Sequence, residues 1–138
     1  MFVLGIDGFD YKLLKSYTQQ GQLPTFKKLL NEGTSGELTS TIPPITGSAW
    51  SSLVTGKNPG KHGIFDFFHR QKDTYDMTPI NSSDRCERGI WDILSEKDRK
   101  IIVVNIPVTY PPQKVKGIMV TGKLTPVSYT HLTLPTKA

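Results

Sequence analysis

The sequence predicts an α/β fold with a mostly parallel sheet. The short and continuous apolar run at residues 2–6 is typical of a parallel strand that is covered on both faces, and residues 101–105 predict a second buried strand. Between them, apolar side chains recur at spacings of three and four residues, which indicates helices with one buried side. Strands and helices that alternate in this way favour the α/β class.

The predicted elements begin and end at residues that favour such boundaries. The first strand stops at Asp7-Gly8, a common turn pair, and helical patterns follow at residues 11–21 and 23–33. Residues 66–85 form a polar and aromatic excursion, a kind of segment that often carries substrate contacts. The remaining expectations are inward-facing Phe26, Leu29 and Leu30, strands at 36–40 and 117–121, a helix at 88–97 and a loop at 107–116.

The most informative stretch is residues 42–67. Pro43-Pro44 holds the chain extended, because the proline ring fixes φ and disfavours helix in the residue before it. Thr46 therefore falls at the start of the next helix. The small or apolar residues 47–54 fit a short helix that is buried on one side, and Gly56 ends it.

The amino end of this helix is a candidate phosphate site. A helix N-terminus offers unpaired N–H groups and a positive dipole end, so a phosphoryl group beside Thr46 would find hydrogen-bond donors in place. We expect Gly47 to contribute to this phosphate contact. Lys57, which is close in sequence, is expected to attract the anionic group. The alternative is that Thr46 is an ordinary N-cap residue.

Asp7 is the second candidate. It follows the first predicted strand, and ligands of open α/β sheets bind at the carboxyl ends of the strands. A carboxylate there can hold a divalent cation, and a metal held by Asp7 would lower the pKa of the Thr46 hydroxyl enough to make it a nucleophile. The alternative is that Asp7 is simply a turn residue.

These residues belong to a wider resemblance. Residues 1 to about 126 resemble the N-terminal part of the alkaline phosphatase superfamily, specifically its type I phosphodiesterase and nucleotide pyrophosphatase branch. The resemblance implies the N-terminal portion of a three-layer sandwich with a mostly parallel sheet. The matching segments are residues 3–8, 21–29, 43–56, 58–64, 90–94 and 104–112.

By this resemblance, Asp7 is a ligand of one metal of a two-metal centre. Thr46 both ligates that metal and attacks phosphorus. The implied reaction is hydrolysis of a small-molecule phosphoester through a phospho- or nucleotidyl-threonine, which water then resolves. The two divalent ions are expected to be zinc.

The sequence departs from the family pattern in two ways. Nucleotide pyrophosphatases commonly place an Asn after the Gly-Ile-x-Asp turn, whereas Phe67 stands here. The remaining family ligands lie in the second half of a longer chain, and we expect His62 and His69 to be structural or surface residues. We therefore expect the chain to be an inactive part of a hydrolase. The alternative is a noncatalytic phosphate-binding fragment, or a pseudoenzyme without the second metal.

The C-terminal segment differs in origin from the rest of the sequence. Residues 127–136 resemble the in-frame translation of a transposon-end sequencing adapter. We therefore divide the chain into an incomplete catalytic domain at 1–126 and a non-native segment at 127–138.

Composition excludes several function classes. The net charge of +5 comes from scattered basic residues, which indicates a solvated surface and no nucleic-acid partner. Residues 56–62 imitate a P-loop, but only three residues separate the two glycines, where a P-loop has four. His62 also stands at the position where a P-loop has the Ser or Thr that binds magnesium. No membrane partner or signal peptide is expected. The single cysteine, Cys86, suits the reducing cytoplasm. The sequence does not indicate an oligomeric state.

Overall fold

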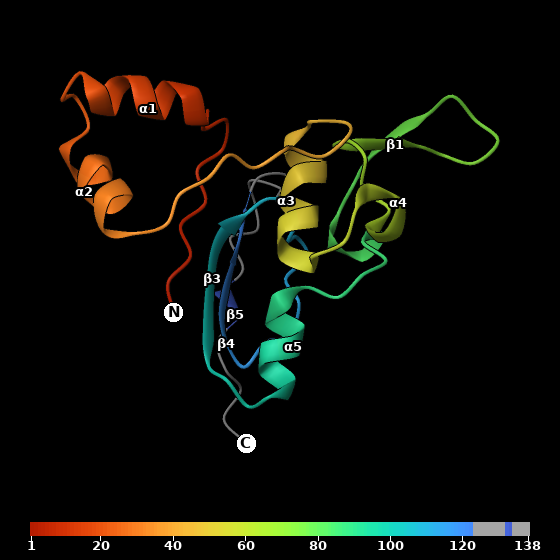
Figure 1. Cartoon of the computed structure of the whole chain (residues 1–138). Helices are drawn as coiled ribbons and strands as arrows, with labels where there is room; N and C mark the ends of the chain where they lie inside the picture. The colour runs from red at the N-terminus through yellow and green to blue at the C-terminus, as the bar shows by residue number, and fades with distance from the viewer. Residues whose placement is uncertain (123–131, 134–138) are drawn as a thin grey trace. The chain divides into compact units, whose positions relative to one another are not determined.

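The computed structural model describes residues 1–122 and 132–133, and the chain divides into two compact units (Figure 1). Unit 1 comprises residues 1–39 and unit 2 begins at residue 40. The predicted boundary at residue 126 lies outside the described residues. Among these residues, none of the helices is both long and apolar enough to cross a membrane.

Unit 1 contains the two predicted helices, α1 (Tyr11–Gln19) and α2 (Pro24–Glu32). Asp10 caps α1, because its carboxylate Oδ1 accepts hydrogen bonds from the backbone N–H groups of Lys12 (2.7 Å) and Leu13 (2.9 Å). A proline at the first position starts α2 without losing a helical hydrogen bond. The rings of Phe9 and Phe26 pack with centroids 5.3 Å apart.

Two strands expected in unit 1 are absent from it, and both predictions are wrong. Residues 2–6 and 36–40 have no strand structure, and the side chains of Phe2 and Leu38 are 85% and 89% exposed. A strand exists only through ladder hydrogen bonds to a neighbour, and no described strand pairs with either segment. Leu29, expected to face inward, is also exposed, whereas Phe26 and Leu30 are half-buried.

Unit 2 confirms the α/β class. Strands β3 (Ile101–Ile106) and β4 (Gly117–Thr121) pair in parallel, starting with Ile101 opposite Gly117. The short strand β5 (Leu132–Thr133) pairs with β4 in the antiparallel sense. Helices α3 (Thr46–Thr55) and α5 (Ile90–Glu96) pack against this sheet (Figure 1).

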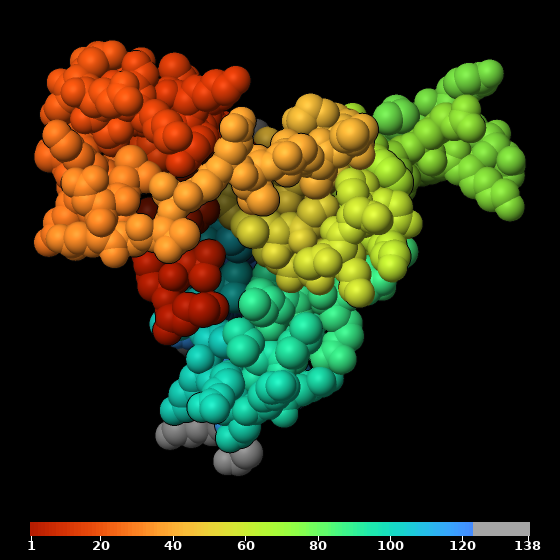
Figure 2. Space-filling view, in the orientation of Figure 1, coloured from red at the N-terminus to blue at the C-terminus, as the bar shows by residue number. Residues whose placement is uncertain are grey.

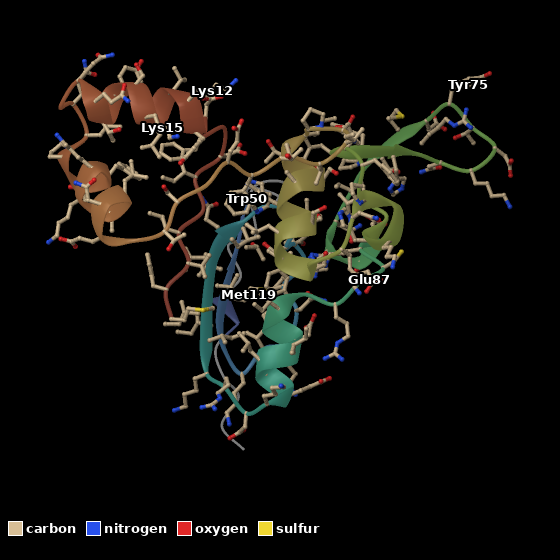
Figure 3. All side chains as sticks on the ribbon, in the orientation of Figure 1. Lys12, Lys15, Trp50, Tyr75, Glu87 and Met119 are labelled. Carbon is tan, nitrogen blue, oxygen red and sulfur yellow. The ribbon has the colours of Figure 1, made fainter. Side chains whose placement is uncertain are left out.

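The core of unit 2 joins these helices to the sheet. Val54 of α3, Trp91 of α5 and Met119 of β4 form one buried cluster, and Met119 is fully enclosed (Figure 3). Burial of such side chains contributes roughly 1.5–3 kcal/mol each. Packing α3 against β4 in this way fixes the helix that carries Thr46. Partly buried neighbours of the cluster are Ile101, Val103, Ile106 and Val115.

The excursion at residues 66–85 contains more regular structure than its composition predicted. Strands β1 (Phe68–Arg70) and β2 (Met77–Pro79) form an antiparallel hairpin, and the 3₁₀ turn η1 (Ser82–Asp84) follows. The hairpin stands out from the rest of unit 2, with Tyr75 near its tip (Figures 2 and 3). Before it lies the short helix α4 (Pro59–His62).

Candidate functional site

Thr46 is the first helical residue of α3, and Ile45 is the N-cap. The backbone of Ile45 is extended (φ −108°, ψ 141°), and its carbonyl accepts the first helical hydrogen bond from Ala49 N–H at 2.8 Å. No side chain caps this end of the helix. The ordinary capping role that was the alternative for Thr46 is therefore wrong. Thr46 is half-buried and is the first residue of the helix.

Gly47 allows a second segment to approach the first turn of α3. A Cβ atom on Gly47 would lie 3.1 Å from the Asp66 carbonyl oxygen and 3.5 Å from Cδ1 of Phe67. The backbone oxygen cannot move away as a flexible side chain could. A larger residue at position 47 would therefore force residues 66–67 to shift by a few tenths of an ångström from the helix start.

The first turn of α3 supplies the donors that a phosphoryl group requires. The first N–H groups of any α-helix have no carbonyl partner within that helix, and the dipole there is positive. Gly47 occupies the second helical position and is buried. The phosphate contact expected of Gly47 stays a prediction.

Two buried hydroxyls lie on the same helix. Ser48 and Ser51 are 0% and 1% exposed, and neither Oγ has a hydrogen-bond partner in the described part of the chain. A buried polar group without a partner costs about 1–3 kcal/mol. The small side chains nevertheless let α3 pack closely along this face.

Lys57 is not brought to Thr46. It follows Gly56, the left-handed C-cap of α3 (φ +65°), so it lies at the opposite end of the helix from Thr46. At 1.5 Å per residue, ten helical residues span about 15 Å, which exceeds the reach of a lysine side chain.

Asp7 lies in a turn of unit 1 and is exposed. Gly8 follows it with φ +66°, a left-handed conformation that glycine adopts at little cost. The expectation that Asp7 stands at the end of a buried strand is wrong, because residues 2–6 form no strand. The turn alternative describes its local structure.

The described residues do not by themselves fit the implied zinc ions. Across residues 1–122 and 132–133, no three His, Cys, Asp or Glu side chains gather into a group that could hold a metal. Zinc sites typically have four ligands, mostly nitrogen and sulfur, whereas Asp7 and Thr46 offer oxygen alone. A complete zinc site therefore needs ligands beyond these.

His62 is structural, as expected. It is fully buried, and its Nδ1 accepts a hydrogen bond from Ile64 N–H at 3.1 Å. Nε2 therefore carries the proton and donates it to Ser52 Oγ on α3 at 2.8 Å. The His62 carbonyl also accepts from Cys86 N–H at 3.0 Å. His62 thus fixes the end of α4 to α3, whereas His69 is exposed on β1.

Acidification is expected to destabilise the fold through His62. Burial lowers the pKa of His62, as does the charge of Arg85, whereas Glu87 raises it. In the unfolded chain this pKa is about 6.5, so below that pH the unfolded state binds more protons than the folded state. The free energy of unfolding should therefore be highest above about pH 6.5 and should fall as the pH drops. Urea titrations between pH 7.5 and 5.5 measure this fall.

A matched variant isolates the contribution of this histidine. His62→Gln cannot titrate, so its stability should be lower at neutral pH but should fall less on acidification. The same loss of stability in both proteins between pH 7.5 and 5.5 would assign the pH dependence to other groups.

Sequence reasoning missed a buried cation, Arg85. It is 7% exposed, and its guanidinium lies 5.0 Å from the centre of the Trp91 ring. Nη2 donates to Oε1 of Gln113 at 2.6 Å, and Nη1 donates to the Val108 carbonyl at 3.3 Å. Trp91 Nε1 donates to the same Gln113 oxygen at 2.7 Å. These contacts fasten α5 to the loop between β3 and β4, and no local pattern in the sequence indicates them.

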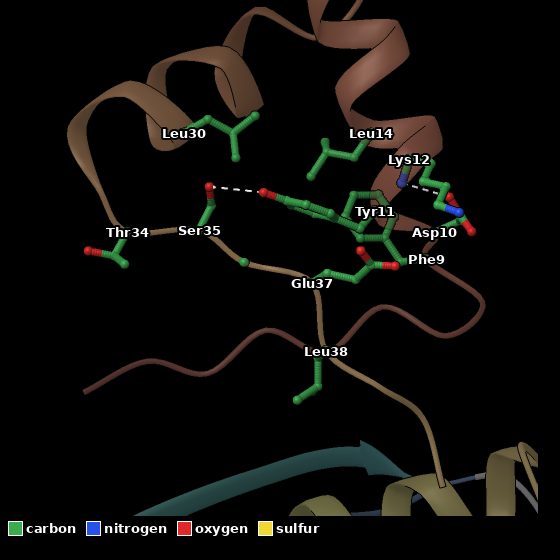
Figure 4. Close-up of a pocket in the computed structure, with 11 residues that line it drawn as sticks. Phe9, Asp10, Tyr11, Lys12, Leu14, Leu30, Thr34, Ser35, Glu37 and Leu38 are labelled. Atoms are coloured by element: carbon green, nitrogen blue, oxygen red, sulfur yellow. Dashed lines mark hydrogen bonds between the residues drawn. The ribbon is translucent and has the colours of Figure 1, made fainter. Parts of the chain in front are cut away.

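Unit 1 contains an open cavity of about 500 Å³ between its two helices and the segment that follows them (Figure 4). Leu14 of α1 and Leu30 of α2 line it, and the hydroxyls of Tyr11 and Ser35 lie 3.3 Å apart at its side. Two carboxylates, Asp10 and Glu37, also line it, and Asp10 caps α1. None of the predicted site residues lines this cavity.

Comparison with known proteins gives one match. The family model described as "Type I phosphodiesterase / nucleotide pyrophosphatase" matches residues 1–135. No curated protein and no solved structure matches the chain.

Proposed function

Because the chain belongs to the type I phosphodiesterase/nucleotide pyrophosphatase family of hydrolases, we propose that Thr46 is the nucleophile of a phosphoester hydrolase. The observation that carries this proposal is the position of Thr46. It is the first helical residue of α3, beside the N–H groups of a helix start, which suit an anion. The substrate class is a small-molecule phosphoester.

The reaction has two steps that both involve Thr46. In the first step, the Thr46 oxygen forms a bond to phosphorus, its proton passes to solvent, and the ester oxygen departs with its electron pair and takes a proton from water. In the second step, water attacks phosphorus, and the Thr46 oxygen regains a proton as it leaves. The sum is one water consumed for each ester bond cleaved.

Gly47 has a supporting role in both steps. Charge develops on the phosphoryl oxygens as the bonds change, and the N–H groups of the first turn of α3 suit that charge. The absent side chain at residue 47 leaves this turn packed against residues 66–67, so the donors are held in place.

We also propose that two zinc ions are cofactors of the whole enzyme. Asp7 would be a ligand of one of them, and the Thr46 oxygen would be a second ligand of that ion. The other ligands would come from residues outside those described. When bound, zinc favours loss of a proton from a coordinated hydroxyl or water.

Asp7→Asn should weaken zinc binding and turnover together. The test uses the protein encoded by the open reading frame that contains residues 1–126, with a nitrophenyl phosphodiester as substrate. The amide is a poorer ligand than the carboxylate, so zinc affinity, measured by competition with a chromophoric chelator, should fall by more than about tenfold.

The matched control is Asp73→Asn, an exposed residue of the hairpin whose positive φ (63°) asparagine also tolerates. It should leave zinc affinity and turnover unchanged. Unaltered turnover in Asp7→Asn would remove Asp7 from the metal centre. Phosphate binding without any turnover in the unmutated protein would support the noncatalytic alternative.

A further inference from the structure

Phe67 is held beside the first turn of α3 by contacts on both sides of its backbone. Its N–H donates to Asp66 Oδ1 at 2.6 Å, and its carbonyl accepts from Ile80 N–H at 2.9 Å. Ile80 is 4% exposed and belongs to a buried cluster with Ile64 and Val108. The root of the projecting hairpin is therefore anchored in the core, and the backbone of Phe67 is fixed.

The ring of Phe67 lies beside Gly47, the residue that follows the proposed nucleophile. Its Cδ1 is 3.5 Å from the position that a Cβ of Gly47 would occupy, and Gly47 directly follows Thr46. The ring is half-buried, so part of it faces solvent. An aromatic side chain on an anchored backbone can bind an apolar part of a substrate with a smaller loss of conformational entropy than a side chain on a mobile segment.

The residues that directly precede Thr46 in the sequence are also apolar. Ile42 is 89% exposed, and Pro43-Pro44 connects it to Ile45. The cation expected nearby, Lys57, lies at the other end of α3. This composition suits an uncharged organic group better than a second anionic group.

We infer that Phe67 is a specificity-determining residue: its ring contacts an apolar or aromatic ester group bonded to the phosphorus that Thr46 attacks. This inference rests on the proposed function and deepens it. The preferred substrates would be phosphodiesters with an aromatic ester group. Phosphate monoesters have no second ester group that would remain on phosphorus and would gain nothing from the ring.

The test compares two substrates that share a leaving group. p-Nitrophenyl phenyl phosphate and p-nitrophenyl methyl phosphate differ only in the ester group that remains on phosphorus. We expect the protein encoded by the open reading frame that contains residues 1–126 to prefer the phenyl ester in kcat/KM by about tenfold. Phe67→Ala should abolish most of this preference and should retain hydrolysis of the methyl ester.

Two further variants keep the test decisive. Phe68→Ala is the matched control, because it removes the neighbouring aromatic ring, which belongs to β1 and is 48% exposed. It should keep the preference. Phe67→Leu preserves an apolar side chain at the anchored position and should show an intermediate preference, which decides the matter if the alanine variant does not fold.

The outcomes separate this inference from the function on which it rests. Hydrolysis by the unmutated protein without a preference for the phenyl ester would overturn the role of Phe67 alone. A preference that survives unchanged in Phe67→Ala, or in Phe67→Leu if the alanine variant does not fold, would do the same. Failure of the unmutated protein to cleave either ester in the presence of zinc would overturn the proposed function, and the inference with it.

Discussion

Replacement of Thr46 by alanine should abolish phosphodiester hydrolysis by the protein that carries residues 1–126, with a loss of at least about a thousandfold in kcat. The alanine side chain has no oxygen with which to attack phosphorus. The fold should survive, because Ile45 is the N-cap of α3 and no side-chain hydrogen bond caps the helix. Steady-state hydrolysis of a nitrophenyl phosphodiester measures the effect, and circular dichroism checks the fold.

Thr39→Ala is the control for this prediction. Thr39 is exposed, and we assign it no chemical role. Its replacement should leave kcat unchanged. Hydrolysis by Thr46→Ala within a factor of about two of the unmutated rate would exclude Thr46 as the nucleophile.

Replacement of Arg85 by alanine should reduce the free energy of unfolding by about 3 kcal/mol. The change leaves the Val108 carbonyl and Gln113 without the hydrogen bonds that Arg85 donates to them. It also leaves a void beside the Trp91 ring. Burial lowers the pKa of Arg85, whereas the charge of Asp92 raises it. Urea denaturation followed by Trp fluorescence measures the loss.

Arg88→Ala is the matched control, three residues further along the chain. Arg88 pairs with Glu96 at 2.5 Å, but both side chains are more than half exposed. Such surface ion pairs contribute about 0–1 kcal/mol. Equal destabilisation by the two substitutions would contradict the structural role given to the Arg85 contacts.

The helices could be predicted because their signals are local. Asp10 before α1, Pro24 at the start of α2 and Gly56 after α3 are boundary residues that act through their own backbone and near neighbours. The structure of segments 2–6 and 36–40 could not be predicted from local signals in the same way. Their apolar or extended character suits a strand, but a strand also needs a partner that no local pattern supplies.

The site shows the same division. The prolines before Thr46 and the glycine after α3 placed the nucleophile candidate at a helix start, whereas Lys57, expected near Thr46, lies at the other end of the helix. The approach of Asp66 and Phe67 to Gly47 joins residues about twenty positions apart. The contact of Arg85 with Gln113 spans 28 positions. Such contacts follow from packing, which alternating and periodic patterns do not encode.

The central claim is that Thr46 becomes covalently bound to phosphorus during turnover. The most direct test is acid quenching of the protein that carries residues 1–126 while it hydrolyses a phosphodiester, followed by mass spectrometry of its peptides. We expect a phosphoryl or nucleotidyl adduct on Thr46 that is lost in Thr46→Ala. An adduct on another residue, or turnover without any adduct when the second step is slowed by low temperature, would contradict the claim.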